Sequence, residues 1–125
     1  MEQAKKVTGT ITDDRRAYER FHLLTRVDVV GAGGGTYWAS LNNVSRHGVA
    51  LSVHQNLRPG QKVMIRFRFR IEDEREQTEH LSAKVIWRSG DNTGLEFETP
   101  LITASPALQK TPYLAAHLML KDAGR

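Results

Sequence analysis

Cysteine is absent from the 125 residues of the sequence, which excludes disulfide bonds, thiolate catalysis and cysteine-ligated metal sites. No apolar run approaches the roughly 18 residues that span a bilayer, so we expect no membrane insertion. No apolar segment of a secretory signal follows the polar start, Met1 to Thr10, so we expect a cytoplasmic location. The five histidines lack metal-ligand spacing, and no nucleophile, base and acid stand out together, so neither a metal site nor an enzyme is expected.

The residues that are present suit one soluble globular domain. A chain of 125 residues can bury one hydrophobic core and is too short for two. Its 39% hydrophobic and 26% charged residues are ordinary for a soluble protein. The formal net charge of +4 suits an anionic partner such as a nucleotide, a nucleic acid or an acidic membrane, and it equally suits a mildly basic surface with no such partner.

Most of the chain consists of short segments in which apolar and polar residues alternate, separated by turn residues. This pattern is typical of an all-β sandwich or barrel. In the clearest segment, Lys62 to Ile71, apolar side chains alternate with Arg66, Arg68 and Arg70, which predicts one buried face and one solvated basic face. Five further strands are expected at residues 25–30, 36–41, 48–53, 81–87 and 94–98. Six strands are enough to close a small antiparallel β-barrel, which removes exposed sheet edges.

Two regions within the barrel are assigned from the same pattern. Residues 72–79 are rich in charge and lie between two expected strands, so we predict a solvated hairpin loop there. Trp87 lies in the apolar register of its strand, which predicts that its indole packs in the core.

The two ends of the chain differ from the alternating pattern. Residues 1–13 lack periodicity and are predicted to form a flexible tail, whereas residues 14–104 are assigned to the barrel. Residues 105–125 are predicted to hold one helix, packed on or beside the barrel. Thr111 and Pro112 have the residue types of a helix N-cap and a first helical position. The expected fold class is therefore all-β with one C-terminal helix.

Two arginines near the start form the first candidate binding motif. Arg16 and Arg20 occupy positions i and i+4, so their side chains point the same way in a helix or in a strand. Two guanidinium groups aimed together suit a phosphate or the O6 and N7 edge of guanine. The alternative is a charged segment whose arginines pair with Asp13, Asp14 and Glu19.

The second candidate motif follows the strand expected at 36–41. In extended backbone Asn43 and Ser45 share a face, and their amide and hydroxyl groups can bind the polar edge of a base or a phosphate. Gly48 permits a close approach that a side chain would block. The alternative is a polar turn between two strands. Alternation continued from Leu41 would bury Asn43 and Ser45, so their exposure requires a β-bulge or an exit at the barrel mouth.

Taken together, Arg-x-x-x-Arg and the later Asn-x-Ser-x-x-Gly resemble the ligand-binding signature of the PilZ domain family. The segments that follow are similar to the family in the same order, at residues 49–51, 59–60, 83–87 and 94–97. The resemblance covers residues 14–100 and implies a six-stranded antiparallel β-barrel of the PilZ-like, split-barrel type. It also implies a bacterial receptor for the second messenger cyclic di-GMP.

The resemblance assigns a role to each motif residue. It implies that Arg16 and Arg20 hold the phosphates and guanine edges of cyclic di-GMP, and that Asn43 and Ser45 contact the ligand from the barrel surface. Gly48 would make room for it. Arg15 adds a third arginine that suits a second ligand molecule, so one or two ligands per chain both remain open.

The family also implies an adaptor role and leaves the output open. Ligand binding would change the conformation and so regulate an unidentified effector protein in motility, exopolysaccharide synthesis, pili or virulence. No cofactor is expected besides the ligand cyclic di-GMP. Two alternatives stay open: a basic barrel that binds single-stranded nucleic acid, and a PilZ-like interaction module that binds no ligand. The nucleic-acid alternative needs several exposed aromatics on one sheet face, and aromatics make up only 7% of the chain.

Overall fold

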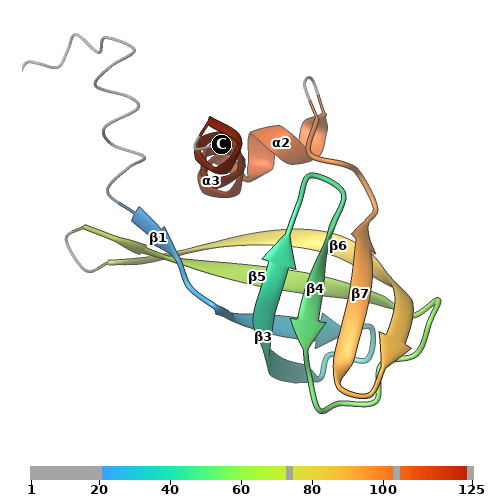
Figure 1. Cartoon of the computed structure of the whole chain (residues 1–125). Coiled ribbons are helices and arrows are strands. Elements are labelled where there is room, and N and C mark those ends of the chain that lie inside the picture. The colour runs from blue at the N-terminus through green and yellow to red at the C-terminus, as the bar shows by residue number, and fades with distance from the viewer. Residues whose placement is uncertain (1–20, 73–74, 103–104, 124–125) are drawn as a thin grey trace, which may run out of the picture.

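The computed structural model describes residues 21–72, 75–102 and 105–123. In these segments seven strands precede two helices (Figure 1). In chain order they are β1 (Phe21–Leu23), β2 (Arg26–Gly31), β3 (Thr36–Val44), β4 (Gly48–Ser52), β5 (Lys62–Ile71), β6 (Glu76–Ser89), β7 (Asn92–Phe97), α2 (Pro106–Lys110) and α3 (Pro112–Ala123).

Strands β2 to β7 close into a six-stranded antiparallel barrel in the order β2-β3-β4-β7-β6-β5. The barrel closes because β5 pairs with β6 along one edge and with β2 along the other. Strand β1 continues along the β2 side of β5, opposite Phe69 to Ile71. The predicted fold class is confirmed, and the short helix α2 precedes the expected C-terminal helix α3. Both helices lie over the barrel end that holds the β3–β4 turn (Figure 1).

The core fills the barrel with the apolar residues of each alternating strand. In β5, Val63, Ile65, Phe67 and Phe69 are buried while the arginines between them face outward. Each fully buried side chain of this size contributes about 1.5–3 kcal/mol relative to exposure. At the barrel end, α3 completes the core with the buried residues Leu114, Ala116 and Leu118.

The outward arginines of β5 are bound by a buried carboxylate rather than only solvated. Asp28 on β2 is 4% exposed and accepts hydrogen bonds from both Arg66 (3.2 Å) and Arg68. Arg68 also bonds Glu76 at 2.9 Å. The prediction of a solvated basic face is therefore wrong for two of its three arginines, because Arg66 and Arg68 form ion pairs within the fold.

The predicted loop over residues 72–79 is wrong for its second half, because β6 begins at Glu76. Glu79 is buried, and its carboxylate accepts bonds from the backbone N–H groups of Tyr113 (2.8 Å) and Leu114 (2.9 Å). This carboxylate thereby caps the positive N-terminal end of α3. The Thr111 hydroxyl, predicted as that cap, instead donates to the carbonyl of Ala107 in α2 (2.9 Å).

Candidate functional site

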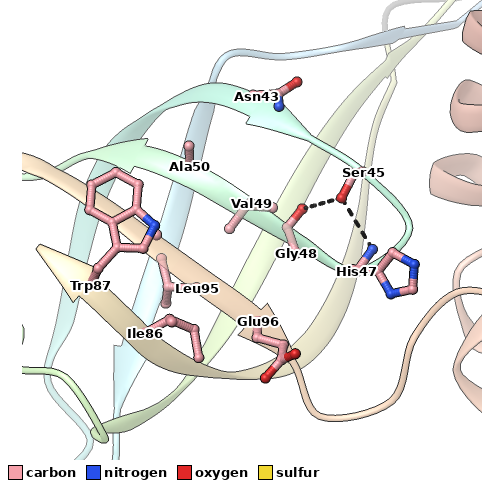
Figure 2. Close-up of a pocket in the computed structure, with 11 residues that line it drawn as sticks. Asn43, Ser45, His47, Gly48, Val49, Ala50, Ile86, Trp87, Leu95 and Glu96 are labelled. Atoms are coloured by element: carbon pink, nitrogen blue, oxygen red, sulfur yellow. Dashed lines mark hydrogen bonds between the residues drawn. The ribbon is translucent and has the colours of Figure 1, made fainter.

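An open pocket of about 350 Å³ lies between the β3–β4 turn, β7 and the end of β6 (Figure 2). Trp87 stands at one end of it, and Ser45 and His47 stand at the other. The lining residues are Asn43, Ser45, His47, Gly48, Val49, Ala50, Ile86, Trp87, Gly94, Leu95 and Glu96. The pocket therefore contains all three residues of the second sequence motif.

A β-bulge in β3 exposes Asn43. Leu41 pairs with Leu51, whereas Asn43 pairs with Ala50, so β3 carries one more residue than β4 at this point. The shift turns Asn43 outward and lets Val44 face the core, where it is 4% exposed. The bulge that the sequence required for exposure is present. The Asn43 amide oxygen accepts a bond from Lys121 Nζ at 3.3 Å.

The Ser45 hydroxyl holds the β3–β4 turn. Its oxygen accepts a bond from the backbone N–H of His47 (3.2 Å), and its O–H donates to the carbonyl oxygen of Gly48, with 3.5 Å between the two oxygens. The backbone N–H of Ser45 bonds the same carbonyl at 2.9 Å. Ser45 stays exposed, and one lone pair of its oxygen remains available to a ligand donor.

Gly48 is required by the packing of β4 on β7. A Cβ added at this position would lie 2.0 Å from the carbonyl oxygen of Leu95 and 3.1 Å from Cα of Glu96. Any side chain at residue 48 would therefore push the two strands apart. This packing constraint is independent of the room for ligand that the resemblance implied.

Trp87 is exposed, and the prediction that it packs in the core is wrong. A register shift between Val85 and Trp87 turns both Ile86 and Trp87 outward, with exposed fractions of 47% and 46%. A Cβ on the facing Gly94 would lie 2.1 Å from the Trp87 indole nitrogen, so the indole lies against the glycine backbone. The pocket thus has an aromatic wall, which alternation alone could not predict.

The first sequence motif lies outside the described residues, so the convergence of Arg15, Arg16 and Arg20 on the pocket stays a prediction. Of the candidate residues, the structure brings Asn43, Ser45 and Gly48 together. Within the described segments, no group of three or more histidine or acidic residues could hold a metal ion. The helices of these segments are all too short or too polar to cross a membrane.

Comparison with known families identifies a match for this chain. The model of the PilZ domain matches residues 14–109, which include both sequence motifs and the whole barrel. No curated protein matches the sequence.

Proposed function

The chain belongs to the PilZ domain family, a family of cyclic di-GMP receptor domains, and on this premise we propose that it is a cyclic di-GMP-binding adaptor. The family is one of binding domains rather than of catalysts. In our proposal the ligand occupies the pocket between Trp87 and the β3–β4 turn. The observation that carries the proposal is that Asn43, Ser45 and Trp87 line this one pocket.

The described groups match the chemistry of a cyclic dinucleotide. The exposed face of Trp87 can stack on a guanine, which contributes about 1–3 kcal/mol per base. Asn43 offers amide donors and Ser45 offers a hydroxyl oxygen to the polar edges of the ligand. These contacts alone fall short of the roughly 8 kcal/mol that micromolar binding needs.

The arginines of the first motif would supply the rest, because a hydrogen bond to a charged group contributes about 1.5–3 kcal/mol. The arginines are close enough along the chain to the first described strand to make such contacts. Leu23 and Thr25 line a second cavity of about 340 Å³, whose wall also includes Asn43. Arg20 precedes Leu23 by three residues, and three extended residues span at most roughly 10 Å. Arg20 is therefore close enough along the chain to reach ligand bound beside Asn43, and in our proposal Arg16, four residues earlier, joins it.

Clamping of the ligand by Arg16 and Arg20 would fix the preceding segment against the barrel and change the surface that a partner meets. Ordering of a segment by a ligand is a common switching mode. We propose that this change regulates an effector protein in the bacterial cytoplasm, in motility, exopolysaccharide synthesis, pili or virulence. Arg15 is assigned to a second ligand molecule, which predicts a stoichiometry of two that falls to one in Arg15→Ala.

Calorimetric titration with cyclic di-GMP, cyclic di-AMP, GTP and a mixed oligonucleotide tests the proposal. We expect selective binding of cyclic di-GMP, weakened about tenfold or more in Arg16→Ala or Arg20→Ala, as the loss of one charged hydrogen bond predicts. Salt-sensitive binding of the oligonucleotide alone would instead support a nucleic-acid-binding barrel. No binding of any of the four would leave a ligand-free interaction module.

A further inference from the structure

Lys121, near the end of α3, bonds directly to the candidate ligand site. Its ammonium group donates to the side-chain oxygen of Asn43 (3.3 Å) and to the backbone oxygen of Val44 (3.0 Å). Both acceptors lie at the end of β3, immediately after the bulge that exposes Asn43. The C-terminal helix α3 is therefore hydrogen-bonded to a residue of β3, Asn43, that lines the pocket.

Asn43 forms part of the wall between two cavities. One is the pocket that contains Trp87, and the other, of about 340 Å³, is lined by Leu41, His117 and Lys121 among others. Lys121 reaches Asn43 from the second cavity, so the Asn43 side chain has an occupied helix side and a side that faces the proposed ligand.

The bond to Lys121 selects one orientation of the Asn43 amide. An ammonium group only donates hydrogen bonds, so it can bond the amide oxygen and not the amide nitrogen. With Oδ1 held by Lys121, the Nδ2 group is directed away from that ammonium. Within the described part of the chain Nδ2 donates no hydrogen bond, so both of its N–H donors are available to ligand. Without Lys121 the amide could rotate by half a turn at little cost.

Helix α3 is held to the barrel by polar contacts near both of its ends. At its start the carboxylate of Glu79 caps the backbone N–H groups of Tyr113 and Leu114. Near its end Lys121 bonds Asn43 and Val44, while Leu118 packs into the core between the two contacts. Only the contact at the end of the helix involves a residue of the proposed ligand site.

We propose that Lys121 is a positioning residue of the cyclic di-GMP site, and that through Asn43 the occupancy of this site is coupled to the docking of α3. The inference rests on the proposed function. A ligand that accepts bonds from Nδ2 polarises the amide and strengthens its Oδ1 bond to Lys121. Because such coupling is reciprocal, a docked helix favours ligand and bound ligand favours the docked helix. The end of α3 thereby becomes a surface through which a partner protein can detect the ligand.

Isothermal titration of cyclic di-GMP into the wild type, Lys121→Ala and Lys110→Ala measures the effect of this residue. Lys110 is an exposed lysine in the last turn of α2 and provides the matched control. We expect Lys121→Ala to weaken binding about three- to tenfold, the change that loss of one hydrogen bond produces, and Lys110→Ala to bind as the wild type does. Thermal melts show that each variant is folded. Equal affinity of Lys121→Ala and wild type would overturn the inference.

A double-mutant cycle separates positioning from simple attraction between Lys121 and an anionic ligand. If Lys121 acts through the amide, Lys121→Ala has no further effect in an Asn43→Ala background. The same loss of affinity in both backgrounds would refute positioning. Hydrogen exchange gives the second readout: ligand should slow exchange of the last α3 amides in the wild type and not in Lys121→Ala. A wild type that binds no cyclic di-GMP refutes the proposed function and the inference together, whereas a binding wild type with an unaffected Lys121→Ala refutes the inference alone.

Discussion

The two sides of the barrel use the same strand pattern for different purposes. On the regular side, β2 and β5 pair without a register shift, and Arg66 and Arg68 are bound to the buried carboxylate of Asp28. On the bulged side, register shifts in β3 and β6 expose Asn43 and Trp87 around one pocket. The arginine-rich face, which is prominent in the sequence, therefore belongs to an ion-pair network of the fold. The groups available to a ligand stand where the alternation is broken.

The largest effect is expected at Gly48 on the bulged side. In Gly48→Ala the new methyl group would overlap the Leu95 carbonyl, so we expect the free energy of unfolding to fall by about 3 kcal/mol. Urea denaturation at equilibrium measures this difference. The control is Gly33→Ala, since a Cβ there meets no atom within 4 Å. Equal stability of the two variants would refute the close approach of β4 and β7.

A smaller effect is expected on the regular side. Asp28→Asn removes the charge that two partly buried arginines share, so we expect it to lower the free energy of unfolding by about 2 kcal/mol. Because this face is separate from the pocket, the affinity of the folded variant for cyclic di-GMP should equal that of the wild type. Loss of binding at full stability would mean that the division between the two sides is wrong.

Replacing the exposed tryptophans contrasts the two sides in binding rather than in stability. Trp87→Ala should lower the affinity for cyclic di-GMP about tenfold, because it removes one stacking surface. Trp38 is 63% exposed, and the guanidinium carbon of Arg26 lies 4.9 Å from the centroid of its ring. It lies on β3 opposite Asp28, so Trp38→Ala should bind cyclic di-GMP as the wild type does. Isothermal titration calorimetry measures both affinities, because its heat signal does not depend on tryptophan fluorescence. A larger loss in Trp38→Ala than in Trp87→Ala would move the ligand to the other face.

The smallest effect concerns Glu79, which faces the core from β6. Burial raises the pKa of Glu79 above its ordinary value, and the bonds from Tyr113 and Leu114 only partly oppose the shift. The folded chain therefore keeps this proton to a higher pH than the unfolded chain does. Its contribution is fully present below the ordinary carboxyl pKa and is lost as the pH rises through the raised value. Across that window the wild type should lose stability relative to Glu79→Gln, since only the wild type carries the titrating carboxyl. Parallel pH dependence of the two proteins would contradict the shift.

The sequence predicted the barrel well because strict alternation determines which residues face the core. The strand Lys62–Ile71 has the predicted bounds, and the bulge at Asn43 could be expected because a polar pair had to leave the apolar face. Trp87 was assigned wrongly because the register shift before it leaves no trace in the alternation. The cap of α3 by Glu79 was missed because its partners stand 34 and 35 residues away. Contacts of this kind depend on tertiary structure and not on local sequence.

The most direct test of the ligand site is an NMR measurement of contacts between cyclic di-GMP and labelled protein. Our account predicts nuclear Overhauser effects from guanine protons to the Trp87 indole and to the Asn43 side-chain amide, together with shifted guanidinium signals of Arg16 and Arg20. Bound ligand whose contacts fall instead on Trp38 and the β2–β5 face, with the Trp87 and Asn43 signals unchanged, would contradict it.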